Sequence, residues 1–117
     1  KGDLVIMPDL YIPSKGDVVW LDFSPQVGHE QSGERPALCI SPKEYNGKTG
    51  LAIFCPITSQ SKGYPFEVLL PDNIAIHGVV LSDHIKSCDW RIRNAKYICS
   101  IPDRILTEVL GKLRTLL

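Results

Sequence analysis

Several features that mark common protein classes are missing from this 117-residue sequence. Its four cysteines form no CxxC pair and its three histidines are scattered, so no zinc-site spacing is present. No apolar run reaches the ~20 residues that a membrane-spanning helix needs. Lys plus Arg number 13 and Asp plus Glu number 13, so the net charge does not indicate a nucleic-acid partner. We therefore expect no membrane segment, no metal and no other cofactor.

The sequence also lacks a nucleophile elbow, a phosphate-cradling glycine loop, internal repeats and low-complexity tracts. Its length suits one domain. We assign this domain to residues 7–117, because Met7-Pro8 looks like a natural start, and expect residues 1–6 to be an added or upstream remnant. Cys39 and Cys55 lie in apolar runs, as reduced thiols of a cytoplasmic protein do.

Runs of β-branched and aromatic residues, separated by Gly, Pro and polar residues, predict short strands. These strands cover residues 17–23, 35–40, 51–57, 66–70, 78–81 and 95–101. Residues 24–34 are expected to form a long loop, and Asn46-Gly47 with Thr49-Gly50 to form a turn.

From Pro102 onward, apolar residues recur at helical spacing. Pro102 suits the first helical position, and Asp103 suits the positive end of the helix dipole. The predicted helix has about four turns. Its wide apolar stripe suits a lid on the sheet and can also contribute to a dimer interface. Short strands and one helix predict an α+β, mainly β, fold: a small, strongly bent β-barrel with a C-terminal helix.

Two polar loops, residues 28–36 and 56–65, are the candidate sites, because functional side chains often lie on loops at strand ends. Their polar side chains are His29, Glu30, Gln31, Arg35, Thr58, Ser59, Gln60, Lys62 and Tyr64. On composition alone, ordinary solvated turns are the better interpretation of both loops. A third segment, residues 86–96, contains four Lys and Arg residues against Asp89, which fits a basic patch or a solvated turn equally well.

Collinear segments of the chain resemble a known family. The segments are Gly16–Phe23, Gly28–Ala37, Tyr45–Gly50, Pro56–Val68 and Gly78–Arg91. The second is similar to the G-x-E-Q-x-G-x-R-P-[AV] signature of the MazF/PemK toxins, and the others resemble the remaining blocks of that family. The resemblance covers roughly residues 11 to 117. His29 and His84 stand where some members have serine and glutamine, which bears on the preferred RNA sequence.

The resemblance implies an SH3-like β-barrel that works as a homodimer. It also implies a sequence-specific endoribonuclease toxin that cuts single-stranded RNA (mRNA) without metal and inhibits translation and growth. A cognate antitoxin with an acidic, flexible tail would neutralise it, and DNA would be contacted only through that complex. By position, Glu30 and Arg35 fall on the catalytic pair and Thr58 on the assisting hydroxyl.

These residue types suit the chemistry, in which the neighbouring 2′-hydroxyl attacks phosphorus and leaves a 5′-hydroxyl. Glu30 can accept the proton of the nucleophile, Arg35 can hold the phosphate with its fork of donors, and Thr58 can donate one more hydrogen bond. Water or His29 can protonate the leaving oxygen. The expected RNA-binding residues are His29, Gln31, Ser59, Gln60, Lys62 and Lys86, with the amides on base edges and the lysines on phosphates.

Two rival classes remain. One is a toxin with the same barrel that poisons a DNA topoisomerase by binding, without catalysis. The other is an SH3-like peptide or chromatin reader, which usually presents an aromatic groove; the three Phe, four Tyr and two Trp residues here are not clustered. Trp20 and Trp90 are expected mainly in the core, and Tyr64 either stacks on a base or packs in the core.

Overall fold

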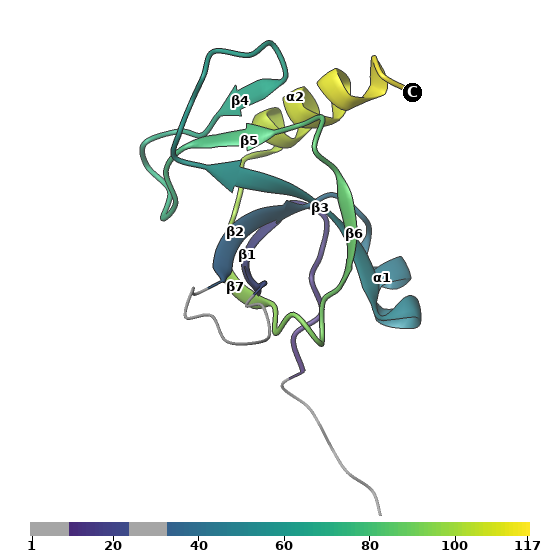
Figure 1. Ribbon diagram of the computed structural model, residues 1–117. Helices are drawn as coiled ribbons and strands as arrows, with labels where there is room; N and C mark the ends of the chain where they lie inside the picture. The colour runs from purple at the N-terminus through teal and green to yellow at the C-terminus, as the bar shows by residue number, and fades with distance from the viewer. Residues whose placement is uncertain (1–9, 24–32) are drawn as a thin grey trace, which may run out of the picture.

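The computed structural model describes residues 10–23 and 33–117, which form one bent antiparallel sheet and two helices (Figure 1). The strands are β1 (Asp17–Asp22), β2 (Glu34–Cys39), β3 (Leu51–Thr58), β4 (Glu67–Leu69), β5 (Val79–Leu81), β6 (Lys86–Asp89) and β7 (Lys96–Ser100). The helices are α1 (Lys43–Thr49) and α2 (Asp103–Arg114). The proposed remnant, residues 1–6, and three predicted site residues, His29, Glu30 and Gln31, lie outside the described residues.

The sheet has the strand order β4-β5-β3-β2-β1-β7, and β6 also pairs with β3. Side chains alternate between two cores, as the period of two in a strand requires. Val18 and Leu38 face one core, whereas their chain neighbours Val19 and Ala37 face the other. Because both faces are buried along most of β1 and in the second half of β2, these stretches contain almost continuous apolar runs.

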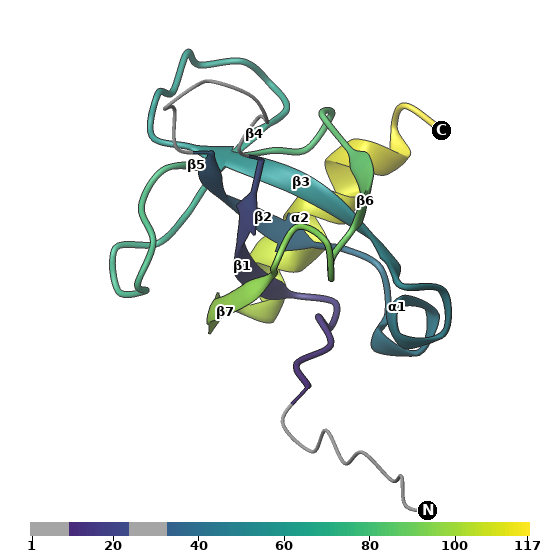
Figure 2. The ribbon, with the colours of Figure 1, turned by 60° about the horizontal axis from the view of Figure 1, so that its bottom comes forward.

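Helix α2 covers the first of these cores (Figures 1 and 2). Ile105, Val109 and Leu113 are its buried side chains, and they lie one turn apart on one face. The predicted helix and its role as a lid on the sheet are confirmed. One detail was wrong: Pro102 is the capping residue before the helix, and Asp103 is the first helical residue. Neither described helix is long and apolar enough to cross a lipid bilayer.

Strand β3 shares one edge between two partners, and this arrangement creates the candidate site. Its first half, from Leu51 to Phe54, pairs with β6, whereas Ile57 and Thr58 pair with β5. Residues 82–85 connect β5 to β6 and pair with neither half. The surface therefore opens between β5, β6 and the start of β2.

Two elements differ from the sequence prediction. Residues 43–49 form α1, although Asn46-Gly47 indicated a turn. The fully buried Asn46 amide explains the helix, because it donates to the main-chain oxygens of Pro13 and Ser41 and so ties this segment to the preceding chain. Strand β6 was missed, because only Cys88 of its four residues is buried. The predicted strands and the α+β, mainly β, class with a C-terminal helix are confirmed.

Candidate active site

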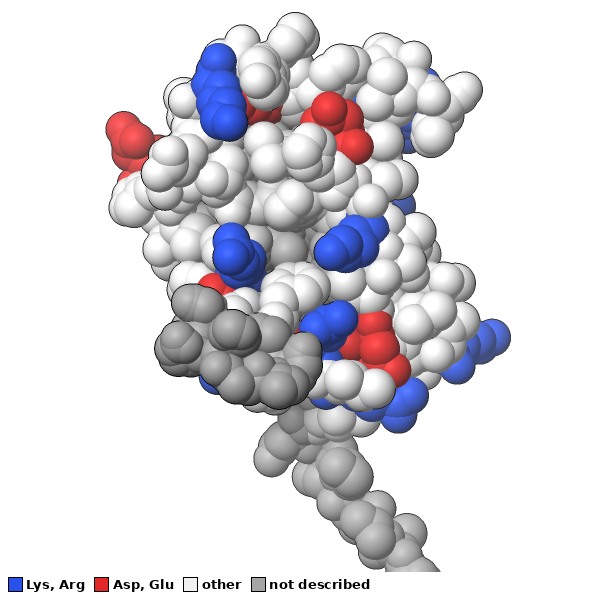
Figure 3. Space-filling model, in the orientation of Figure 1, with Lys and Arg blue, Asp and Glu red and all other residues white. Residues whose placement is uncertain are grey.

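A pocket of about 300 Å³ opens where β1, β2, β3 and β6 meet. Its walls combine apolar side chains of the second core with three basic or imidazole side chains. The lining residues are Leu21, Phe23, Arg35, Pro36, Ala37, Phe54, Pro56, His84, Lys86 and Cys88. Figure 3 shows this face of the molecule, with separate blue side chains around a hollowed central area. An apolar floor with a cationic rim suits a ligand that carries both flat rings and phosphates.

Arg35 is held at the rim by the β1–β2 ladder. It is the second residue of β2 and lies opposite Leu21 of β1, while its own side chain is exposed. Strand pairing thus fixes the backbone of Arg35, which lines the pocket. Among residues 10–23 and 33–117, no carboxylate lies within ion-pair distance of the Arg35 guanidinium. Its fork of donors is available for a phosphate.

Lys86 stands at another part of the rim, as the first residue of β6. Its ammonium nitrogen lies 5.1 Å from the ring centre of Phe23, and the Arg93 guanidinium lies 4.8 Å from the same ring. Cation–π contacts of this kind hold a positive charge beside an aromatic face. Two of the four basic residues in segment 86–96 therefore converge at Phe23.

The other two basic residues of that segment, Arg91 and Lys96, have different partners. The Lys96 ammonium forms an ion pair of 2.9 Å with Glu34. Arg91 stacks on Trp90, 5.4 Å from its ring. The basic patch is therefore local, which reconciles a cationic rim with a net charge of zero.

A second pocket, of about 320 Å³, adjoins the first, because His84 lines both. Residues from the end of β3 to the β5–β6 connection line it, and most of them have polar side chains. The lining residues are Thr58, Gln60, Lys62, Tyr64, Glu67, Leu81, Asp83 and His84. Thr58 ends β3, and its hydroxyl oxygen accepts a hydrogen bond of 3.1 Å from the Gln60 N–H. The Thr58 hydroxyl proton stays available for a ligand.

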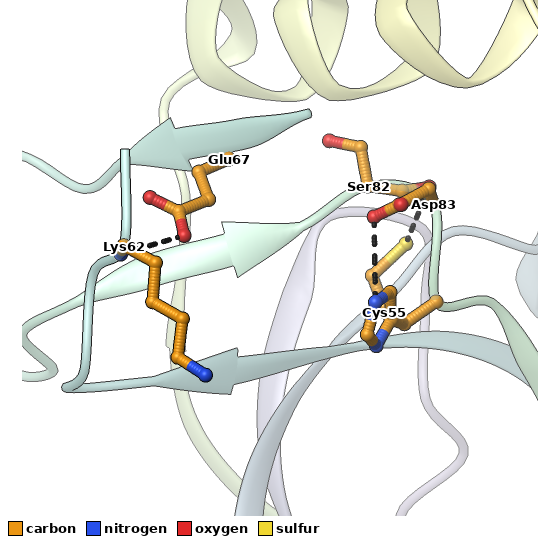
Figure 4. A network of polar contacts seen from close by, with 6 residues as sticks. Cys55, Lys62, Glu67, Ser82 and Asp83 are labelled. Carbon is orange, nitrogen blue, oxygen red and sulfur yellow. Dashed lines mark hydrogen bonds and ion pairs between the residues drawn. The ribbon is translucent and has the colours of Figure 1, made fainter. Parts of the chain in front are cut away.

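Cys55 lines neither pocket and packs in the core that α2 covers. Its side chain is fully buried, and its thiol contacts the main-chain oxygen of Ser82 at 4.0 Å (Figure 4). Burial, and then the charge of Asp83, raise the pKa of the Cys55 thiol to about 12. A thiol that stays protonated does not attack phosphorus or carbon. Within the described ranges, no three His, Cys, Asp or Glu side chains are grouped as a metal ion needs.

The structure divides the residues predicted from the sequence between two adjoining pockets. Arg35 and Lys86 line the first, whereas Thr58, Gln60 and Lys62 line the second. Ser59 is exposed and lines neither pocket. Tyr64 is 60% exposed and lines the second pocket, so the core alternative for this ring is wrong, whereas the core assignment of Trp90 is confirmed. Trp20 is only half-buried.

Sequence reasoning missed several lining residues. His84 was noted only as a departure from the family, yet it joins the two pockets. Its position just after the predicted strand 78–81 was the available signal. Phe23 and Glu67 belong to predicted strands, and nothing in their local sequence indicates that they face a ligand.

A sequence profile described as "PemK-like, MazF-like toxin of type II toxin-antitoxin system" matches residues 14–117. The chain belongs to this family. The "Endoribonuclease toxin MazF" of Escherichia coli (strain K12) is 43% identical over 111 residues, covering 95% of this chain and 99% of the relative. The "Endoribonuclease PemK" of Escherichia coli is 35% identical, covering 88% and 80%.

A solved structure agrees with this assignment. A chain in the crystal structure of MazE–MazF from Deinococcus radiodurans is 56% identical and superposes with a TM-score of 0.87, covering 91% of this chain and 96% of that one. The predictions of the MazF/PemK family and of its SH3-like fold are confirmed. The prediction of an endoribonuclease is confirmed at the level of the family, since the curated relatives have that name.

Proposed function

We propose that this chain is an endoribonuclease toxin that cleaves single-stranded RNA at specific sequences in the cytoplasm, inhibits translation and growth, and is neutralised by a cognate antitoxin. The observation that supports this most strongly is the pair of adjoining pockets, one with Arg35 and Lys86 and the other with Thr58 and Gln60. Unpaired bases fit an apolar floor, and phosphates fit a cationic rim. The names of the relatives supply the reaction.

The proposed reaction needs no metal. The 2′-oxygen attacks phosphorus, the bond from phosphorus to the 5′-oxygen breaks, and the products are a 2′,3′-cyclic phosphate and a 5′-hydroxyl. The nucleophile loses a proton to a base, and the leaving oxygen gains one. We assign Glu30 as the base. We assign Arg35 to stabilise the negative charge on the phosphate oxygens, because its donors bind the dianionic transition state more tightly than the substrate.

Thr58 assists from the second pocket with one hydrogen bond, and Gln60 and Lys62 contact the strand beyond the cleaved bond. His84 faces both pockets and is suited to contact the nucleotide at their junction. We further propose His29, Gln31 and Ser59 as RNA contacts. Water or His29 protonates the leaving oxygen.

The partners follow from the same proposal. An acidic, flexible segment of the antitoxin binds the cationic rim and competes with RNA, and DNA is contacted only through that complex. The toxin acts as a homodimer. Large apolar side chains that are exposed in the single chain, among them Leu69 at 72% and Leu117 at 86%, support a further interface.

The decisive experiment maps cleavage ends on a long RNA of mixed sequence in the presence of EDTA. Wild type should cut at a few short sequences and leave 5′-hydroxyl ends. Glu30→Ala and Arg35→Ala should stay folded and lose at least about 100-fold in rate, as the loss of a transition-state contact does. Lys48→Ala is the matched control, because Lys48 is exposed on α1. Helix α1 leads into the first residue of β3, whereas Thr58 is the last residue of that strand.

Cleavage that requires Mg²⁺, or normal cleavage by both variants, would contradict this mechanism. A toxin that stops growth without cutting RNA, and whose Arg35→Ala variant stays toxic, would instead indicate a non-catalytic poison.

A further inference from the structure

The first residue of β4, Glu67, binds three consecutive residues of the loop that precedes it. Its Oε1 atom accepts hydrogen bonds from the Ser61 hydroxyl at 2.8 Å and the Gly63 N–H at 3.1 Å. Its Oε2 atom accepts the Lys62 N–H at 2.9 Å (Figure 4). One carboxylate therefore satisfies donors that an exposed loop would otherwise leave to water.

The loop held in this way supplies much of the second pocket. Gln60, Lys62 and Tyr64 line that pocket together with Thr58. Figure 4 shows that Lys62 meets Glu67 through its backbone, while its ammonium group points away. Glu67 therefore orders the loop without neutralising the cation that faces a ligand.

The negative charge of Glu67 is part of this arrangement. Hydrogen bonds from the Lys62 N–H, the Ser61 hydroxyl and the Gly63 N–H hold the pKa of the Glu67 carboxyl below its usual value. Charge-assisted hydrogen bonds of this kind are stronger than neutral ones. The loop thus binds the ionised carboxylate in preference to the protonated form.

Helix α2 anchors the same strand from the other side. The Lys112 ammonium donates to the main-chain oxygens of Pro65 at 2.6 Å and of Glu67 at 3.2 Å. The backbone at the start of β4 is therefore fixed to the helix, and the Glu67 side chain reaches back from this fixed point to the loop. The turn between the loop and β4 is closed by a hydrogen bond of 3.1 Å from the Glu67 N–H to the Tyr64 main-chain oxygen.

From these contacts we propose that Glu67 is a positioning residue that holds residues 60–64 in the conformation that binds the RNA strand. Glu67 then governs how tightly and how selectively RNA is bound, and it takes no part in breaking the phosphodiester bond. This proposal rests on the proposed endoribonuclease function.

Glu67→Gln tests the proposal with little change of shape. The glutamine keeps one acceptor oxygen, but its NH₂ group is a donor. In either orientation this group faces another donor: the Lys62 N–H, or the Ser61 hydroxyl and the Gly63 N–H, which share Oε1 in the wild type. We expect KM to rise about tenfold while kcat stays within about twofold, because binding is lost equally in the ground and transition states. Selectivity between cleavage sequences should fall as well. Glu44→Gln, which removes an exposed carboxylate from α1, should change neither constant.

A second readout does not depend on RNA. Trypsin cleaves after lysine, and Lys62 lies within the ordered loop, so Glu67→Gln should be cut after Lys62 about tenfold faster than wild type, as local opening predicts. Ser61→Ala removes one of the three contacts and should shift both KM and trypsin cleavage in the same direction by a smaller factor. This variant also decides the question if Glu67→Gln does not fold.

Three results would overturn the proposal: an unchanged KM with unchanged trypsin cleavage, a fall in kcat with no rise in KM, or equal effects in Glu44→Gln. If wild type does not cleave RNA, the proposed function fails, whereas the trypsin comparison still shows whether Glu67 orders the loop.

Discussion

The indole N–H of Trp90 donates a hydrogen bond of 2.9 Å to the main-chain oxygen of Asn46, 44 residues away in the sequence. Both residues are buried, at 3% and 0% exposure. This hydrogen bond joins α1 to the residue that follows β6. It is a polar contact beside the apolar cluster to which Trp90 belongs. Such contacts are costly to break, because each leaves a buried group without a partner.

Asn46→Ala keeps this main-chain contact but removes the side-chain contacts of Asn46, and it should destabilise the fold strongly. The Asn46 amide donates to the Pro13 oxygen at 2.7 Å and accepts from the Ser41 hydroxyl at 2.6 Å. Its removal takes the donor from the Pro13 oxygen and the acceptor from the Ser41 hydroxyl proton in the interior, and we expect a loss of about 2–4 kcal/mol in the free energy of unfolding. Urea unfolding measures this loss. Asn73→Ala, at an exposed loop position, should stay within about 0.5 kcal/mol of wild type; equal losses in the two variants would contradict the role of the buried amide.

Gly78→Ala and Gly111→Ala should change stability in opposite directions. Gly78 has a φ of +127°, and a Cβ there would lie 2.3 Å from the main-chain oxygen of Thr58. The added methyl group pushes β5 off β3, and we expect a loss above about 2 kcal/mol together with reduced RNA cleavage. Gly111 lies in α2 with nothing within 4 Å of its Cβ position, so alanine should stabilise by about 0.5–1 kcal/mol. Thermal unfolding of both variants checks the pair, and a stable Gly78→Ala protein would show that β5 can shift freely.

Ser82→Ala should be neutral or stabilising. The Ser82 hydroxyl is fully buried and has no hydrogen-bond partner in the part of the chain that the structure describes. Removing an unsatisfied hydroxyl relieves a desolvation cost, so we expect a gain of about 0–2 kcal/mol in unfolding free energy. A loss above that range in urea unfolding would reveal a partner for this hydroxyl.

High pH should weaken the fold through Cys55. Its pKa is raised to about 12, so the native state holds the thiol proton more tightly than the unfolded chain, where the pKa is about 8.5. The stabilisation is complete below the unfolded value and is lost as the pH rises from there toward the native value. Cys55→Ala should therefore lose less stability than wild type between pH 8 and about 10. In the native protein at pH 8, iodoacetamide should modify the half-buried Cys99 before Cys55, which peptide mass spectrometry can follow.

Strand identity could be predicted from the sequence because burial leaves a local signal. Strand β1 could be predicted from its run of buried apolar residues, Val18, Val19 and Leu21. Helix α2 could be predicted from the helical spacing of Ile105, Val109 and Leu113. Helix α1 could not be predicted in this way, since its formation depends on contacts with residues far along the chain: the Asn46 side chain donates to the Pro13 oxygen, and the Asn46 main-chain oxygen accepts from Trp90. Turn-forming residues are a weak signal when a buried network opposes them.

The family pattern predicted candidate residues for the site, but it did not predict how the fold groups them. Arg35 and Lys86 share a pocket because β2 and β6 both pair with β3, and local sequence does not contain that register. The division of Thr58 from Arg35 into adjoining pockets also follows from pairing, since β5 joins β3 at Thr58. The loop-ordering contacts of Glu67 have no local signature, because a glutamate at the start of a strand is usually a solvated side chain.

The shared edge of β3 has a consequence for how the molecule can vary. Residues 82–85 must pass from β5 to β6 beside Cys55 and Pro56, and His84 within them borders both pockets. Extra residues inserted here would have to project outward over the junction of the pockets, since both flanking ladders are fixed. The length of this short connection therefore limits what fits between the two pockets, and we expect substitutions of its exposed residues, such as His84, to change what binds there.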